Sequence, residues 1–182
     1  MAECMFAMAF LSVAAAALLL DASGLITTTD SAMQQTVALG MAQQLLDELS
    51  GMRYMEVGAS PTSATLGPES NDAGPGWSGY DDIDDFNGLR AQPPTDRWAI
   101  ALGNDNDNGY TRDPSFACTP NYLSRFHQQV DVFYVQSSAL TTPTSTPTYY
   151  RAAKVQILYD DPKLGTQSII SLQRVFSYVP GS

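Results

Sequence analysis

Two short segments of the chain concentrate oxygen-bearing side chains of the kind that bind metal ions. Residues 80–88 place four carboxylates in five positions, and residues 104–109 alternate asparagine and aspartate before a glycine. Calcium takes about six to eight oxygen ligands from flexible loops, and each segment supplies several. We expect either a calcium site or two solvated acidic turns, and the candidate ligands are Asp81, Asp82, Asp84, Asp85, Asp105 and Asp107.

The segment 104–109 resembles the front half of an EF-hand loop, but two of its positions differ. Asn104 stands where such a loop begins with aspartate, and Ser115 stands where its bidentate glutamate falls. An EF-hand is therefore excluded, so any calcium site here belongs to another class. No cofactor other than calcium is indicated.

Residue types used in catalysis do not form a recognised motif in this sequence. His127 is the only histidine and lies in a strand-like segment, and the chain lacks a nucleophile-elbow sequence. Cys4 and Cys118 lie far apart, and neither a phosphate-binding loop nor a histidine cluster for zinc is present in the sequence. We therefore predict that the protein is not an enzyme.

The acidic composition bears on the partners of the protein. The formal net charge is -10, from 19 acidic and 9 basic residues. A surface of this sign repels phosphate backbones, so we expect no nucleic-acid partner.

A threonine- and proline-rich segment occupies residues 141–148. Such segments form mobile hairpin loops or exposed patches for O-glycosylation, and both interpretations remain open. The candidate glycosylation sites are Thr141, Thr142, Thr144, Ser145, Thr146 and Thr148.

The N-terminal residues 1–54 have the pattern of one long helix that changes character along its length. From Cys4 to Leu20 the sequence carries no charge, and Ser12 is its only polar side chain. This run would form a helix of roughly 25 Å, at the short end of a bilayer's hydrocarbon core. Further on, apolar residues recur every four positions at Met33, Val37, Met41, Leu45 and Leu49, which predicts an amphipathic helix. We divide the helix into a stem, 1–25, and an amphipathic upper half, 26–54.

The remaining residues, 55–182, predict a β-rich head. Its first part, 58–95, is punctuated by glycine and proline and is expected to form a long loop. Strands are predicted near 97–102, 126–136, 149–159 and 167–178 from alternating apolar side chains, with short hairpin connections at 137–147 and 160–166. The expected fold class is α+β, with the long helix packed on an antiparallel sheet of about four strands.

The N-terminal pattern resembles that of type IV pilins and type II secretion pseudopilins. The resemblance is carried by Met1-Ala2-Glu3, which leads into the apolar run from Cys4 to Leu20, and by Ala42–Leu49, which is similar to the upper helix of minor members. Members of this family lose a short basic leader to a prepilin peptidase and are methylated at the new N-terminus. Either the mature N-terminus lies slightly upstream, or Met1 is the processed residue.

The resemblance implies a structural subunit of an extracellular filament, which would stand in the inner membrane before assembly. It implies a homopolymer built by pilus assembly machinery, in which the Glu3 carboxylate pairs with the N-terminal ammonium of a neighbouring subunit. The implied assembly residues are Glu3, Met1, Phe6, Phe10, Leu18, Leu19 and Leu20. The alternatives are a minor pseudopilin of a periplasmic secretion apparatus and a monomeric binding domain anchored by a single membrane helix.

Overall fold

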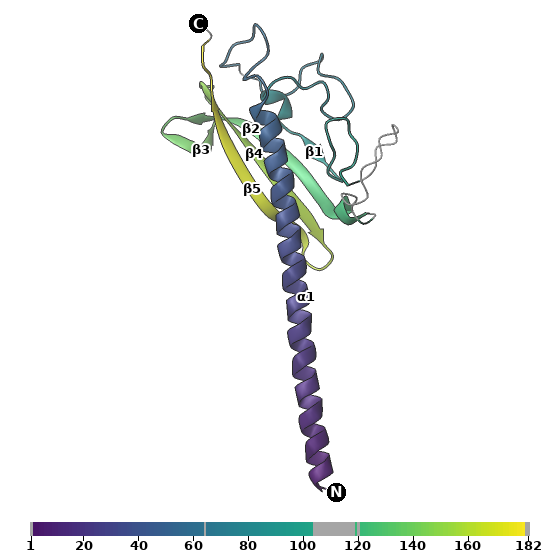
Figure 1. Cartoon of the computed structure of the whole chain (residues 1–182). Helices are drawn as coiled ribbons and strands as arrows, with labels where there is room; N and C mark the ends of the chain where they lie inside the picture. Colours follow the sequence, from purple (N-terminus) through teal and green to yellow (C-terminus); the bar gives the residue numbers. More distant parts are fainter. Residues whose placement is uncertain (1, 64, 104–118, 120, 181–182) are drawn as a thin grey trace. The chain divides into compact units, whose positions relative to one another are not determined.

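The computed structural model describes residues 2–63, 65–103, 119 and 121–180, except the helix side chains at 2–14, 17, 20, 22–24, 26 and 27. Within these residues, a single α-helix is followed by a long loop and then by a β-sheet (Figure 1). The elements are α1 (Ala2–Ser50), the 3-10 helix η1 (Asp84–Phe86), β1 (Arg90–Ala91), the 3-10 helix η3 (Tyr122–Arg125), β2 (Phe126–Gln136), β3 (Ala139–Thr144), β4 (Tyr150–Asp161) and β5 (Gly165–Ser177).

The chain divides into two compact units, Met1–Val37 and Ala38–Ser182. The first unit consists of the greater part of α1. The second contains the last turns of α1, the long loop and the whole sheet. Among the residues that the structure describes, no helix is both long enough and apolar enough to cross a membrane.

The sheet is antiparallel, with its strands in the order β1-β2-β4-β5 and with β3 paired to β2. The pairing of β2 with β4 runs from Phe126 opposite Tyr159 to Tyr134 opposite Arg151. The short connections between successive strands favour this antiparallel arrangement, because two antiparallel strands can be joined by a tight turn. Alternate side chains along β2 are buried, as expected when one face of a sheet forms the core: Phe126, Gln128, Val130, Val132 and Tyr134.

The last turns of α1 supply the helical part of this core. Their buried side chains recur at intervals of three and four residues, which places them on one face: Ala38, Met41, Ala42, Leu45, Leu46 and Leu49. Arg174 of β5 donates to the Leu46 carbonyl oxygen at 3.4 Å, which places β5 against this segment (Figure 1). Full burial of each leucine stabilises the unit by about 1.5–3 kcal/mol. Met33, predicted on the same stripe, is 54% exposed, and Ala38 is the first buried residue among the helix side chains that the structure describes.

The predicted fold of a long helix packed on a sheet of about four strands is wrong. The sheet has five strands, and only the part of α1 from Ala38 onward belongs to the same compact unit as the sheet. The additional strands are β1, within the predicted loop, and β3, within the predicted hairpin connection. The described residues that follow α1 form mostly β-strands and loops.

The predicted strand at 97–102 does not form. An Asp96 side-chain oxygen accepts hydrogen bonds from the backbone N–H groups of Trp98 and Ile100, both at 2.9 Å, and Ala99 adopts a positive φ of 65°. An aspartate that bonds to nearby backbone groups offers the chain an alternative to a strand ladder. Only an isolated bridge between Thr95 and Ala101 remains. The other three predicted strands correspond to β2, β4 and β5.

Candidate functional site

The acidic part of the long loop lies against the segment that follows α1. The Arg53 N–H donates to the Asp81 carbonyl oxygen at 3.4 Å, and the Ile83 N–H donates to the Arg53 carbonyl oxygen at 3.0 Å. Arg53 and Asp82 form an isolated parallel bridge through these bonds. Arg53 therefore lies beside residues 81–83, although 28 positions separate it from Asp81 in the sequence.

Aromatic side chains hold this loop in place. Trp77 and Phe86 are buried, with ring centroids 6.4 Å apart, and Tyr80 meets Phe86 edge-on at 5.2 Å. The indole N–H of Trp77 also donates to a Glu48 carboxylate oxygen of α1 at 3.2 Å. The two buried rings, Trp77 and Phe86, each bury about 150–250 Å² and fix the loop to the core.

Two aspartates organise the acidic turn through their own side chains. One Asp82 carboxylate oxygen accepts the Asp84 N–H at 2.9 Å. One Asp85 carboxylate oxygen accepts the N–H groups of Asp81 and Asp82, at 2.9 and 3.1 Å. Such local bonds are typical of aspartate in turns, and they explain why so many carboxylates fit into one short segment.

The loop assembles two groups of three carboxylates. The first triad is Glu56, Asp81 and Asp82, and the second triad is Glu69, Asp72 and Asp85. Within each triad, one ligand oxygen from every member lies within 4.8 Å of the others.

Several of these carboxylate oxygens are inaccessible to solvent and have no hydrogen-bond partner. Among the described residues they are Glu56 Oε2, Asp81 Oδ1, Asp82 Oδ2 and Asp85 Oδ1. Burial, first, and the neighbouring Asp84 together raise the pKa of Asp82 to about 7. Burial likewise raises the pKa of Asp85. A buried carboxylate without a partner is costly in its ionised form, so both groups favour a bound proton or a nearby cation.

Asp84 belongs to neither triad, because it forms an ion pair with Arg151 of β4. Both side chains are nearly inaccessible, and Arg151 also donates to the Tyr54 carbonyl oxygen. The Arg151 guanidinium lies 4.5 Å from the centre of the Tyr54 ring and 5.4 Å from that of Tyr134. Because this ion pair is buried on both sides, the Asp84 carboxylate is held by Arg151 and is not placed as a metal ligand.

The structure thus separates the predicted calcium ligands. It brings Asp81 and Asp82 into the first triad and Asp85 into the second, and it gives Asp84 to Arg151. Asp105 and Asp107 lie outside the described residues. Glu56, Glu69 and Asp72 were not predicted, since none of them lies in a dense acidic run and only the tertiary fold brings them to the cluster.

Apart from Met1, which lies outside the described residues, the predicted assembly residues lie on α1, and the side chains of two of them are described. Leu18 is 71% exposed and Leu19 is 72% exposed. The side chains of the other predicted assembly residues lie outside the described part of the structure: Met1, Glu3, Phe6, Phe10 and Leu20.

The predicted glycosylation sites differ in how freely their hydroxyl groups face solvent. Thr148 donates its hydroxyl to the carbonyl oxygens of Val135 and Tyr150, at 2.7 and 3.0 Å, so this hydroxyl is engaged in the fold. The Thr144 hydroxyl oxygen accepts the Thr146 N–H at 3.2 Å. The exposed candidates are Thr141, Thr142, Ser145 and Thr146.

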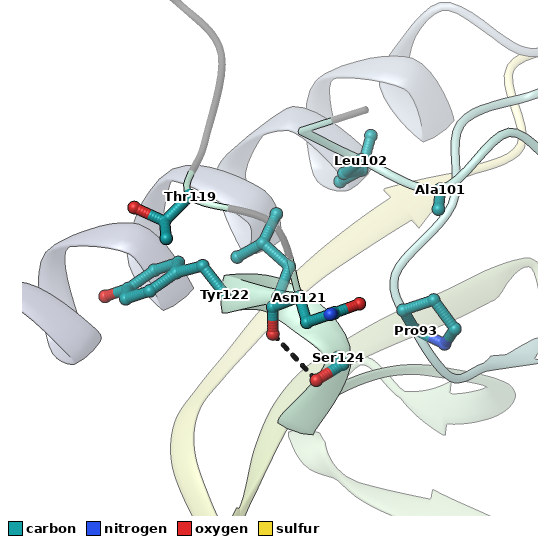
Figure 2. Close-up of a pocket in the computed structure, with 8 residues that line it drawn as sticks. Pro93, Ala101, Leu102, Thr119, Asn121, Tyr122 and Ser124 are labelled. Carbon is teal, nitrogen blue, oxygen red and sulfur yellow. Dashed lines mark hydrogen bonds between the residues drawn. The ribbon is translucent and has the colours of Figure 1, made fainter. Parts of the chain in front are cut away.

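A separate small cavity of about 50 Å³ lies beside η3 (Figure 2). Its wall includes Asn121, whose carbonyl oxygen accepts the Ser124 hydroxyl at 2.7 Å, and Pro93 from the preceding loop. None of its described lining residues is acidic or basic. A cavity of this volume has room for a few water molecules.

No protein-family model, curated protein or solved structure matches the chain.

Proposed function

We propose that the protein is a structural subunit of an extracellular filament of the type IV pilus kind, and that it polymerises through α1. The observation that supports this proposal is the exposure of large apolar side chains on the N-terminal unit. Leu18, Leu19 and Leu25 are 71%, 72% and 68% exposed in the isolated chain. Exposed apolar side chains that gather on one element are typical of an interaction surface.

Packing against copies of the same helix would remove these side chains from water. Each leucine that becomes fully buried contributes about 1.5–3 kcal/mol, so three of them contribute several kcal/mol per subunit. Before assembly, the same apolar stem would lie in the inner membrane, where prepilin peptidase and the assembly machinery would act on the chain.

Glu3 has a distinct role in this proposal. A carboxylate in an apolar filament core is costly unless a positive charge lies beside it. Pairing with the N-terminal ammonium of a neighbouring subunit would satisfy Glu3 in only one axial register. Glu3 would therefore select the register of the filament more than it would stabilise the subunit.

The first test is assembly of the purified full chain as detergent is removed, followed by electron microscopy. We expect fibres from the natural chain and none from Leu19→Asp, because a buried charge opposes helix packing. The matched control is Gln35→Asp, which adds the same charge at an exposed position of the same helix and should still form fibres.

Three results separate this proposal from its alternatives. Glu3→Ala should leave the head folded, as judged by circular dichroism, and should reduce the yield of fibres. A chain that stays monomeric without detergent would contradict the filament role and favour an anchored binding domain. A chain that enters fibres only with other subunits would favour a minor pseudopilin.

A further inference from the structure

We propose that the first triad, Glu56, Asp81 and Asp82, is a binding site for one calcium-class divalent cation. The site lies where the chain leaving α1 runs beside the acidic turn. Its ligand oxygens lie within 4.8 Å of one another. Two oxygens on opposite sides of a calcium ion are about 4.6–5.2 Å apart, so this spacing accommodates one shared ion.

Unpartnered oxygens provide the second observation. Each member of the triad has one carboxylate oxygen that is shielded from solvent and accepts no hydrogen bond: Glu56 Oε2, Asp81 Oδ1 and Asp82 Oδ2. Asp82 is 0% exposed, so bulk solvent does not supply the missing partner. Buried polar groups are nearly always satisfied, and three unsatisfied carboxylate oxygens in one place indicate a ligand that bonds to oxygen.

The charges of the site point to a divalent ion. Once ionised, the three carboxylates carry three negative charges, and the Arg53 guanidinium, which pairs with Asp81, supplies one positive charge. Among the ion pairs of the described residues, none includes Glu56 or Asp82. One divalent cation would balance the remaining two negative charges and would relieve the cost of burying them.

The donor set favours calcium over the transition metals. All three side chains supply hard carboxylate oxygens, whereas zinc and copper sites use imidazole or thiolate ligands. Three carboxylates leave several positions of a calcium ion for backbone carbonyl oxygens and water. Magnesium demands a more regular octahedral arrangement, which a loop of this kind does not impose.

The second triad does not meet the same conditions. Within it, Asp72 accepts the Glu69 N–H at 2.6 Å, and Asp85 accepts two backbone N–H groups. Only Asp85 retains a shielded oxygen without a partner, and Glu69 is exposed. It therefore serves as the internal comparison for the first triad.

The test uses the full chain in detergent, stripped of metal with a chelator and then titrated with calcium chloride. Isothermal titration calorimetry should give one ion per chain. The melting temperature of the head should rise by about 5–10 °C at a calcium concentration near one hundred times the Kd. Absence of binding heat together with an unchanged melting temperature would overturn the proposal.

Variants locate the ion. Asp82→Asn and Glu56→Gln keep the size of each side chain and remove its charge, and both should weaken calcium binding at least tenfold. Glu56 is half-buried, so Glu56→Gln keeps the test usable if Asp82→Asn fails to fold. The matched control, Asp72→Asn in the second triad, should bind calcium as the natural chain does.

Two outcomes would overturn the assignment even if metal binds. Loss of binding in Asp72→Asn, with binding retained in Asp82→Asn, would move the ion to the second triad. An equal shift in melting temperature with magnesium chloride at the same concentration would contradict the choice of calcium.

Discussion

The buried ion pair between Arg151 and Asp84 gives the sharpest prediction for stability. Arg151 is 0% exposed and Asp84 is 4% exposed, so the two charges have been removed from water together. Asp84→Asn retains the shape of the side chain and removes its charge, which leaves the guanidinium buried and unpaired. Removing one partner of a buried pair costs about 3–5 kcal/mol.

The remaining contacts of Arg151 reduce this cost only in part. Its guanidinium still lies over the Tyr54 and Tyr134 rings, and a desolvated cation–π contact contributes about 2 kcal/mol or more. These contacts exist in the natural chain as well, so they do not replace the lost carboxylate. We therefore expect a loss near 4 kcal/mol. With a urea dependence of about 2 kcal/mol per molar, the unfolding midpoint should fall by about 2 M.

Urea denaturation of the full chain, followed by the fluorescence of the buried Trp77, measures this shift. Asp131→Asn is the matched control, because Asp131 pairs with Arg90 in an exposed ion pair. An exposed pair contributes about 0–1 kcal/mol, so the control midpoint should move by less than about 0.5 M.

A double-mutant cycle tests the cause of the shift. Replacing both partners with apolar residues, Arg151→Met with Asp84→Leu, should cost far less than the sum of the two single changes, because no charge is then left unpaired. Additive costs, or a midpoint shift for Asp84→Asn as small as that of the control, would refute the reasoning.

Two further predictions concern the end of the sheet and the glycines. Hydrogen bonding, first from Thr166, lowers the pKa of Asp160. The ionised carboxylate therefore stabilises the fold at pH values above the ordinary aspartate pKa of about 4. This stabilisation is lost as the pH falls through the lowered pKa. Asp160→Asn should therefore lower the urea midpoint at pH 7 and have a shrinking effect towards pH 3; a constant difference would contradict this. Gly40→Ala in α1 should stabilise the protein by about 1 kcal/mol, since a Cβ there meets nothing within 4 Å. Gly79→Ala should lower the melting temperature, because its Cβ would overlap the backbone of residue 72; equal effects of the two changes would refute the packing argument.

The strands with regular alternation could be predicted from the sequence. β2 and β4 alternate apolar and polar side chains over many residues, and a half-buried sheet needs that pattern. The segment 97–102 also looked strand-like, but the Asp96 side chain competes for the backbone N–H groups that a ladder would need. β3 was missed because its sequence is rich in threonine and proline and its side chains are mostly exposed.

The candidate cation site was only half predictable. Asp81 and Asp82 were found because aspartates are dense in one short segment. Glu56 could not be found, because its position beside them depends on the backbone pairing of Arg53 with residues 81–83, and pairing between distant segments leaves no local pattern. The length of α1 that is buried was not predicted for a similar reason. An apolar stripe shows which face of a helix can be buried, but it does not show at which residue the contact with the rest of the fold begins.

The hydrogen bonds that join the long loop to the end of α1 and to the segment after it have a consequence for proteolysis. Residues 57–60 are exposed, and this stretch offers a protease an accessible peptide bond. On one side of it, Arg53 is tied to Asp81 and Ile83, and on the other side Trp77 is tied to Glu48. Cleavage within residues 57–60 would break the chain, but these hydrogen bonds would still hold the two fragments together. The nicked molecule would migrate as two bands under denaturing conditions and as one particle in native buffer.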